Sequence, residues 1–397
     1  MLSVADRQFV QAHLDEDPSR LLLSARRFPG IQVPLAVAQI EALRKIRFKV
    51  PSWYRFDLDF PPALSVEQAS SEQTARFKAG LFTGHSMADL TGGMGIDAFF
   101  FAQHFERVRY IEQNPELAAI ARHNFARLGA TNIECVESSA EVFLTNPTGG
   151  LDLIYIDPAR RDDRQGRVFR LEDCKPNVLK IKDLLLNAAP RVLIKAAPLF
   201  DLHLAVGQLG AVSHIWVVSV HNECKEVLYL LEKAPPPAGT IPIEAVCLDG
   251  ATQRTFLFTW EEERKGKPEF SPPQQFLYEP DAAILKAGAF QAFARRFGLA
   301  KLHPHTHLYT AQTPVADLPG RCFQIEAVVK YDRKAVQPWT PEGRANIAVR
   351  NFPDPVTAVR KRLQLSDGGA VYLFAVTAWP DRKILIVCRR INSEAFE

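Results

Sequence analysis

The sequence lacks the features that mark a disulfide-stapled or membrane-spanning protein. Its six cysteines are scattered and none forms a CxxC pair, which is typical of reduced thiols. No apolar run reaches the length of a membrane span, and the amino-terminal residues do not combine a basic patch with an apolar stretch. We therefore expect a cytoplasmic protein that has no membrane partner.

The chain also has little net charge. With a formal charge of +3 and a pI near 8.5, any surface for nucleic acid must be a local basic patch. Internal repeats and low-complexity tracts are absent as well. The 397 residues, of which 47% are hydrophobic and 23% charged, suffice for two or three globular domains with cores of their own.

Short apolar runs that alternate with helical stretches fill the middle of the chain. Five of these runs predict parallel strands that helices cover on both faces. Two further runs, HIWVVSV and EVLYLLE, are separated only by HNECK and predict an antiparallel hairpin. The predicted fold class is therefore α/β, with a doubly wound, mostly parallel Rossmann-like sheet and an antiparallel terminal hairpin. Another hairpin, around Asp249 and Gly250, is expected to lie against the same domain.

Breaks in the pattern divide the chain into four predicted regions. A helical region over residues 1–75 contains KVPSWYRFDLDFPP, a connector rich in proline and aromatic residues. The α/β domain spans residues 76–262 and is followed by the break KGKPEFSPPQQ. A small segment over residues 272–320 and a compact mixed α/β unit over residues 321–397 complete the chain.

The first predicted strand ends in a glycine-rich loop, ADLTGGMGIDAFFF, that leads into a helix. Asp89, Thr91, Gly93 and Gly95 alternate in this loop, where glycines permit tight turns and close approach to a ligand. The two glycines and Ala98 also match the GxGxxA dinucleotide pattern, which is weak evidence alone. An aspartate is unfavourable beside a pyrophosphate but suits the cationic amino-acid tail of S-adenosylmethionine, which we predict as the cofactor.

The next two strand ends are consistent with a nucleoside site. Glu112 ends the second strand, where a carboxylate can accept hydrogen bonds from both ribose hydroxyls of either S-adenosylmethionine or NAD. Ser139 follows the third strand, where a contact to adenine is expected. Taken singly, Asp89 could cap a helix and Glu112 could be a solvated strand end. Their occurrence together around a glycine loop favours cofactor binding.

The fourth strand, DLIYID, ends in a charged and proline-containing turn. In a sheet of this kind that position lies beside the reactive group of the cofactor, where a methyl group is delivered. Methyl transfer from a sulfonium depends mainly on alignment of the acceptor. We expect Asp157, Pro158 and Arg160 to be catalytic. Asp157 would accept hydrogen bonds from the acceptor and also line the cofactor site, while Pro158 would rigidify the turn.

Further polar residues are candidates for binding the methyl acceptor. Lys195 ends the fifth strand and Asn222 lies in the hairpin turn, so both are expected at the rim of the acceptor pocket. A cluster of charge after the fourth strand would suit a phosphate-bearing substrate, unless its members only pair with one another in a solvated loop. This cluster comprises Arg160, Arg161, Asp162, Asp163, Arg164 and Arg167.

These motifs together resemble the class I S-adenosylmethionine-dependent methyltransferases, and most closely the bacterial methyltransferases with a THUMP-like domain. The resemblance rests on DLTGGMGIDAFFFAQ, YIEQNP and IDPARRD, and extends to LEDCKPN, IKAAPLFD, NECKEVLYLLE and YEPDAAILKAG. It covers nearly the whole chain. It implies that residues 272–320 are ferredoxin-like, that residues 321–397 form a THUMP-like domain, and that the substrate is RNA, either ribosomal or transfer RNA.

Two departures from neighbouring families bear on the reaction. Methyltransferases that act on exocyclic amino groups usually carry an aromatic residue after a double proline, whereas Ala159 and Arg160 follow Pro158 here. The DPAR tetrapeptide also occurs in uracil-5 methyltransferases, but these need a cysteine after the fifth strand, where this chain has IKAAPLFD. Cys174, the nearest thiol in sequence, is expected in a helix or loop, so covalent catalysis by cysteine is disfavoured.

Two surface features have both functional and structural interpretations. The basic stretch VRNFPDPVTAVRKRLQL, with Arg350, Arg360, Lys361 and Arg362, could follow an RNA backbone or form a solvated helix face. His303, His305 and His307 alternate, but Pro304 favours a loop and no second ligand cluster accompanies them, so we expect no metal site.

The leading hypothesis is a methyltransferase that acts on structured RNA. The alternatives are an RNA chaperone that binds S-adenosylmethionine without turnover, and a methyltransferase for a small molecule or a protein. An NAD oxidoreductase is least favoured, because it would leave the DPAR loop unexplained.

Overall fold

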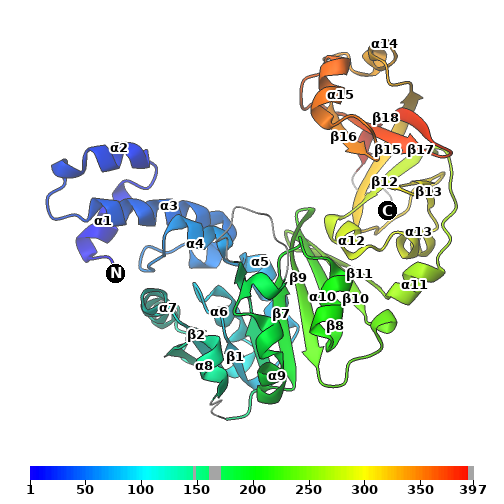
Figure 1. Cartoon of the computed structure of the whole chain (residues 1–397). Coiled ribbons are helices and arrows are strands. Elements are labelled where there is room, and N and C mark those ends of the chain that lie inside the picture. The colour runs from blue at the N-terminus through cyan, green and yellow to red at the C-terminus, as the bar shows by residue number, and fades with distance from the viewer. Residues whose placement is uncertain (146–148, 161–170, 392–397) are drawn as a thin grey trace. The chain divides into compact units, whose positions relative to one another are not determined.

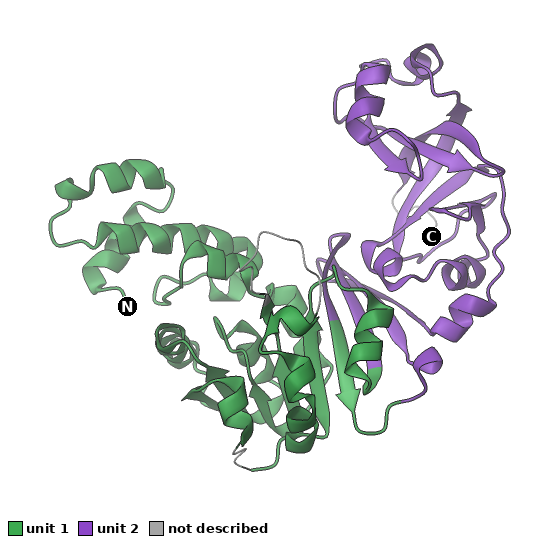
Figure 2. Cartoon of the chain, in the orientation of Figure 1, with its two compact units in different colours: residues 1–213, 228–235 green, residues 214–227, 236–397 purple. Residues whose placement is uncertain are grey.

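The computed structural model describes residues 1–145, 149–160 and 171–391 of the chain (Figure 1). The chain forms two compact units, which are distinguished by colour in Figure 2. One unit comprises Met1–Ser213 and Leu228–Pro235, and the other comprises His214–Val227 and Pro236–Glu397. Among the described residues, no helix combines the length and the apolar character needed to cross a membrane.

The first unit begins with a helical region. Asp17 accepts a hydrogen bond from the backbone N–H of Ser19 and caps the second helix, which has Pro18 in its first turn. Ser3 and Asp6 form a capping box at the first helix. The helices are α1 (Val4–Ala12), α2 (Pro18–Leu23), α3 (Val33–Lys49), α4 (Ala63–Gln68) and α5 (Glu72–Gly80).

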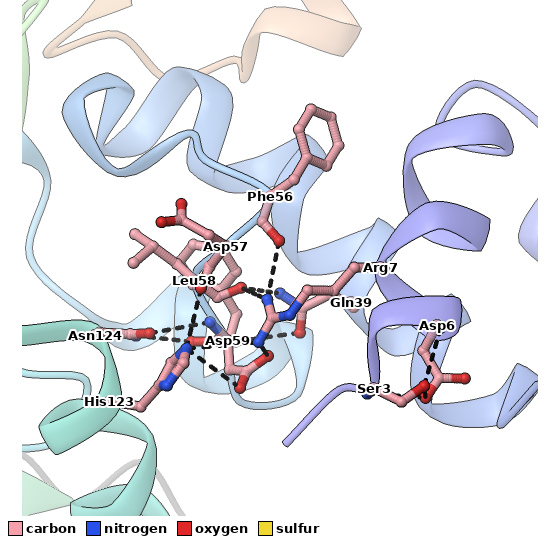
Figure 3. Close-up of polar contacts among 11 residues, drawn as sticks. Ser3, Asp6, Arg7, Gln39, Phe56, Asp57, Leu58, Asp59, His123 and Asn124 are labelled. Atoms are coloured by element: carbon pink, nitrogen blue, oxygen red, sulfur yellow. Dashed lines mark hydrogen bonds and ion pairs between the residues drawn. The ribbon is translucent and has the colours of Figure 1, made fainter. Parts of the chain in front are cut away.

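A set of polar contacts ties this helical region to the α/β part of the same unit (Figure 3). The guanidinium group of Arg7, on α1, lies 2.8 Å from the buried carboxylate of Asp59. The side chain of Asn124, on α7 (Pro115–Leu128), exchanges two hydrogen bonds with the backbone of Asp59, of 2.7 and 3.0 Å. Phe56 adds its carbonyl oxygen as an acceptor for Arg7, at 2.9 Å. Segments far apart in sequence are thus joined through Asp59.

The larger sheet of the chain is mostly parallel, with strand order β11-β10-β8-β9-β7-β4-β1-β2-β3. The predicted α/β fold class is confirmed: the five parallel strands and the antiparallel hairpin are all present. The strands are β1 (Gly84–Asp89), β2 (Phe105–Glu112), β3 (Ile133–Glu137), β4 (Leu153–Ile156), β7 (Arg191–Ala196), β8 (Val212–Val220) and β9 (Glu223–Glu232). The intervening helices are α6 (Ile96–Phe101), α7, α8 (Ala140–Thr145), α9 (Val178–Ala188) and α10 (Leu202–Leu209).

The sheet is larger than the sequence pattern predicts. The hairpin of β10 (Ile243–Asp249) and β11 (Thr252–Phe258) does not merely lie against the domain, because β10 pairs in parallel with β8 and extends the sheet. The hairpin of β8 and β9 is consequently not at the sheet edge. Pairing satisfies the backbone groups that β8 would otherwise expose along that side. Residues Ala245 and Val246 of β10 are fully buried, as befits an internal strand.

The second unit also contains a sheet of its own, with order β13-β14-β12-β15-β18-β17-β16. Antiparallel pairing of Leu277 with Phe323 joins the two carboxyl-terminal segments that the sequence separates at residue 320, so both contribute to one sheet. Its strands are β12 (Phe276–Pro280), β13 (Ala300–His303), β14 (Thr306–Ala311), β15 (Gly320–Val329), β16 (Asn346–Arg350), β17 (Val371–Ala378) and β18 (Arg382–Ile391). The helices of this unit are α11 (Trp260–Lys265), α12 (Ala282–Ala287), α13 (Gln291–Phe297), α14 (Arg333–Val336) and α15 (Val356–Leu363).

Candidate functional site

The carboxyl ends of four parallel strands bring the central candidate residues to one edge of the sheet. Asp89 ends β1 and Glu112 ends β2, while Asp157 directly follows β4 and Lys195 lies near the end of β7. Parallel pairing of β1 with both β2 and β4 keeps these ends level with one another. This edge is where ligands bind in open α/β sheets.

The glycine loop takes the conformation that its residues permit. Gly93 and Gly95 have φ angles of +52° and +83°, a region that favours glycine. A side chain at Gly95 would lie 2.5 Å from the ring of Phe125, whereas one at Gly93 would meet no atom nearer than 3.8 Å. Gly95 therefore serves packing as well as conformation, while Gly93 faces open space on which a ligand can lie.

Asp89 is a buried carboxylate with one unsatisfied oxygen. Its Oδ1 accepts a hydrogen bond from the backbone N–H of Thr91 at 3.1 Å, but Oδ2 has no hydrogen-bond partner among the described residues. Burial raises the pKa of Asp89 well above its usual value, and the nearby carboxylates of Asp97, Asp157 and Glu112 raise it further. Within the described part of the chain this carboxylate forms no ion pair, and the ammonium group of S-adenosylmethionine would provide a cationic partner.

Glu112 holds the loop while keeping capacity to bind a ligand. One of its oxygens accepts from the backbone N–H of Gly93 at 2.9 Å, and the other accepts from that of Asn114 at 2.8 Å. Each carboxylate oxygen can accept more than one hydrogen bond, so ribose hydroxyls can still be bound. The structural and functional interpretations of Glu112 therefore do not exclude each other.

Ser139 follows β3, as expected, and its hydroxyl accepts from the backbone N–H of Val142 at 3.2 Å. That contact gives Ser139 a structural role at the start of α8. A contact between Ser139 and adenine stays a prediction.

Asp157 is held from two sides. Its backbone N–H donates to Oγ1 of Thr91 at 2.7 Å, which links the turn after β4 to the glycine loop. Its carboxylate forms an ion pair with the ammonium group of Lys195. The predicted acceptor-pocket residue Lys195 thus contacts the predicted catalytic residue Asp157 directly.

A buried polar network that no sequence motif indicates lies next to this edge. Asp97, in the first turn of α6, accepts hydrogen bonds from Ser70 at 2.8 Å and from Tyr155 at 2.9 Å. The ammonium group of Lys78, whose side chain is fully buried, lies 3.1 Å from the same carboxylate. Burial opposes ionisation of Asp97, but Lys78 and Lys195 lower its pKa overall. The position of Asp97 just after the glycine loop was the available signal.

The charges at this edge favour a cationic ligand. Asp89, Asp97, Glu112 and Asp157 provide four carboxylates, whereas the lysines among these contacts are Lys78 and Lys195. A pyrophosphate would add negative charge to this cluster, but S-adenosylmethionine carries both an ammonium and a sulfonium group. The residues present therefore fit S-adenosylmethionine better than a dinucleotide.

The turn after β4 continues into a short strand. Pro158 is buried, and β5 (Ala159–Arg160) pairs with β6 (Cys174–Lys175), so Cys174 lies in a strand and not in the predicted helix or loop. Arg160 and Cys174 are partners in this ladder. The predicted cluster of Arg161, Asp162, Asp163, Arg164 and Arg167 lies outside the described residues.

Candidates in the second unit have partners within that unit. Asn222, in the turn between β8 and β9, accepts from the backbone N–H of Ala282 at 3.0 Å and so caps α12. His303 accepts from the backbone N–H of His305 at 3.1 Å and contacts Asp381 at 3.0 Å. Within the described ranges, there is no group of three or more histidine, cysteine, aspartate or glutamate side chains that could hold a metal ion.

Comparison with protein families and curated proteins identifies the relatives of this chain. Residues 276–319 match a ferredoxin-like domain, and residues 320–390 match a THUMP-like domain. An uncharacterised S-adenosylmethionine-dependent methyltransferase of Mycobacterium tuberculosis is 27% identical over 304 residues, which cover 76% of this chain and 80% of that protein. Ribosomal RNA small subunit methyltransferase J of Coxiella burnetii is 33% identical over 79 residues, 18% of this chain and 31% of that protein.

A solved structure is similar over the whole chain. It is that of a protein from Porphyromonas gingivalis W83, provisionally named a methyltransferase, with 32% identity and a TM-score of 0.88. The similarity covers 99% of this chain and 100% of that one. Sequence motifs, site chemistry and overall architecture therefore agree: the chain belongs to the family of S-adenosylmethionine-dependent methyltransferases that carry a THUMP-like domain.

Proposed function

We propose that this methyltransferase modifies a base in structured RNA, with ribosomal RNA as the first candidate and transfer RNA as the alternative. The proposal of methyl transfer rests mainly on the Asp157–Lys195 pair, which lies at the same edge of the sheet as the candidate cofactor residues. The THUMP-like match over residues 320–390 supports an RNA substrate, as does the likeness to a ribosomal RNA methyltransferase. These similarities motivate the choice of substrate to test first.

In the proposed mechanism, the residues at the sheet edge bind and orient. Asp89 would take the ammonium group of the cofactor on its unpartnered oxygen, and Glu112 would accept from the ribose hydroxyls. Bound there, S-adenosylmethionine supplies an electrophilic methyl group. Asp157 would accept a hydrogen bond from the acceptor base and hold its reacting atom in line. Lys195 would keep the carboxylate of Asp157 in place.

We further propose that the carboxyl-terminal unit over residues 321–397 holds the RNA. Of the basic residues predicted to follow an RNA backbone, Arg350 lies 2.5 Å from the buried carboxylate of Glu279, which points to a structural role. Arg360 pairs with Asp367, and the guanidinium group of Arg362 lies over the ring of Tyr331. The exposed residues of α15, including Lys361 and Arg362, are therefore the better candidates for phosphate contacts.

The test is transfer of labelled methyl from S-adenosylmethionine by the purified protein into total RNA. RNA from a strain that lacks the gene should accept label in one nucleoside, whereas RNA from the parent strain should not, because its site is already modified. The Asp89→Asn variant, which we expect not to bind S-adenosylmethionine, serves as the negative control. If neither RNA accepts label while the protein still binds S-adenosylmethionine in a calorimeter, RNA is rejected as the acceptor in favour of a small molecule or a protein.

A further inference from the structure

A group of aromatic and basic side chains lies on the helical region of the first unit, in which Arg47, Phe48 and Arg55 are exposed and Tyr54 and Phe56 are half-buried. Phe48, near the end of α3, is 82% exposed. The guanidinium carbon of Arg47 lies 5.7 Å from the centre of the Phe48 ring and 5.9 Å from that of Tyr54. Tyr54 in turn lies 5.9 Å from the ring of Phe56. We call Arg47, Phe48, Tyr54, Arg55 and Phe56 the aromatic–basic surface.

Folding of the helical region does not explain this surface. The buried residues of α3 include Leu43 and Ile46, and Trp53 is buried against Phe99, so the apolar contacts of this segment are made elsewhere. Burial of a phenylalanine side chain stabilises a fold, and Phe48 forgoes this gain in its exposed position. An exposed aromatic side chain that lies beside a cation is more readily explained by binding.

The charge of this segment is of one sign. Between Arg44 and Arg55 the sequence RKIRFKVPSWYR has five basic residues and no acidic residue. Four of these five side chains have partners: Arg44 donates to backbone carbonyls, Lys45 pairs with Glu67, Lys49 donates to the carbonyl oxygen of Glu67, and Arg55 pairs with Asp57. Arg47 forms no ion pair with any residue that the structure describes, so its charge is available to a ligand.

We propose that the aromatic–basic surface binds unpaired bases and the backbone of a single-stranded or looped segment of the RNA substrate. Aromatic rings give faces on which bases stack without regard to sequence, and an adjacent guanidinium group contributes cation–π contacts and neutralises phosphate. A duplex would offer phosphates but no free base faces. This inference rests on the proposed function, to which it adds a second contact region and a preference for unpaired nucleotides.

The aromatic–basic surface is firmly attached to the unit that holds the cofactor site. Phe56 accepts a hydrogen bond from Arg7 through its carbonyl oxygen, while its ring points away from the polar contacts around Asp59 (Figure 3). Asp59 is in turn bonded to Asn124 on α7. RNA bound at this surface would therefore be held at a fixed place on the unit that carries Asp89 and Asp157.

The test uses the full-length protein and a fluorescein-labelled 20-nucleotide RNA of mixed sequence, as a single strand or annealed to its complement. Binding is followed by fluorescence anisotropy over a range of salt concentrations. Loss of one stacked base predicts that Phe48→Ala weakens binding of the single strand by about fivefold or more, with a much smaller effect on the duplex. Arg47→Ala should reduce the slope of log Kd against log salt by about 1.

The control is Leu23→Ala, which removes an apolar side chain that is 89% exposed on α2 and lies outside the aromatic–basic surface. It should leave RNA binding unchanged. All variants should bind S-adenosylmethionine in a calorimeter and melt at the same temperature as the parent. If the parent protein binds single-stranded RNA and Phe48→Ala binds it equally well, the inference is wrong while the proposed function stands. If the parent binds neither form of this RNA, or binds the duplex as well as the single strand, the inference is rejected, and the methyl-transfer assay on total RNA decides the proposed function separately.

Discussion

The ammonium group of Lys195 and the carboxylate of Asp157 form an ion pair between the ends of neighbouring parallel strands. Asp157 also donates its backbone N–H to Thr91 in the glycine loop. The residue expected to meet the methyl acceptor is thus fixed at its backbone by the glycine loop and at its side chain by a lysine. This arrangement suits catalysis by positioning, because neither contact needs to change during methyl transfer.

Replacement of Asp157 by Ala should lower kcat by about 100-fold, because the acceptor loses its positioning contact, and should leave S-adenosylmethionine affinity largely intact. Lys195→Met should lower kcat by about tenfold without a matching change in KM for the cofactor, and Lys195→Arg should recover part of the loss. Steady-state kinetics and calorimetry check both variants. Equal losses of cofactor binding and of turnover in Asp157→Ala would contradict the role in catalysis.

Asp89→Asn should abolish detectable cofactor binding yet stabilise the ligand-free protein by about 0.5–2 kcal/mol, as is common when a strained functional group is removed. Because the pKa of Asp89 is raised in the folded state, the folded protein binds more protons than the unfolded chain above pH 3.8. The carboxyl group of Asp89 therefore contributes stability at low pH that is lost as pH rises from 3.8 through the pKa of Asp89 in the folded state. In thermal unfolding across this pH range, the melting temperature of Asp89→Asn should rise relative to that of the parent protein as pH increases. A destabilised variant would show that Asp89 has a mainly structural role.

Binding of S-adenosylmethionine should release protons. The pKa of Asp89 is raised in the free protein by burial and by its carboxylate neighbours, and a bound ammonium group would favour the ionised form. Affinity should consequently fall as pH is lowered through the pKa of the free protein. Calorimetry in buffers with different ionisation enthalpies measures the number of protons released. A binding enthalpy independent of the buffer, at a pH where affinity changes, would rule out this coupling.

The two glycines of the loop should respond differently to alanine. Gly95→Ala places a methyl group 2.5 Å from the ring of Phe125 and should destabilise the fold by about 1–3 kcal/mol. Gly93→Ala meets no such obstacle and carries mainly the cost of its left-handed backbone. It should weaken cofactor binding more than it lowers stability. Urea unfolding and calorimetry on the two variants give the comparison, and similar stability losses would show that packing at Gly95 is more adaptable than expected.

The contact between Arg7 and Asp59 should matter more than a similar contact on the surface. Arg7→Met leaves the buried carboxylate of Asp59 without its cation and should cost about 3 kcal/mol of unfolding free energy. Arg55→Met breaks an exposed pair with Asp57 and should cost less than about 1 kcal/mol. Both variants replace an arginine by methionine, so chemical denaturation of the two gives the difference in unfolding free energy between the buried and the exposed contact.

Much of the site could be predicted because strand ends are local features of sequence. Asp89, Glu112 and Asp157 each follow an apolar run, and parallel pairing necessarily brings such ends to one edge. The network around Asp97 could not be predicted in the same way, because Lys78 and Tyr155 reach it from elements distant in sequence.

The same limit applies to the fold. The alternation of apolar runs and helices predicted the parallel sheet, whereas the pairing of β10 with β8 depends on a choice among strand edges that no local pattern encodes. Cys174 illustrates a further limit, since a strand of two residues is too short to show any periodicity.

The hydrogen bonds of Asn124 and Ser70 bear on how this enzyme can be divided. A protein cut to begin at residue 76, where the helical region was expected to end, would start inside α5 and lose both Asp59 and Ser70. Asn124 would then lack the backbone with which it exchanges two hydrogen bonds, and Asp97 would lack one of its donors beside the candidate cofactor site. The amino-terminal helices therefore belong to the same compact unit as the parallel strands, and we expect an active fragment to need at least the segment that contains Asp59 and Ser70.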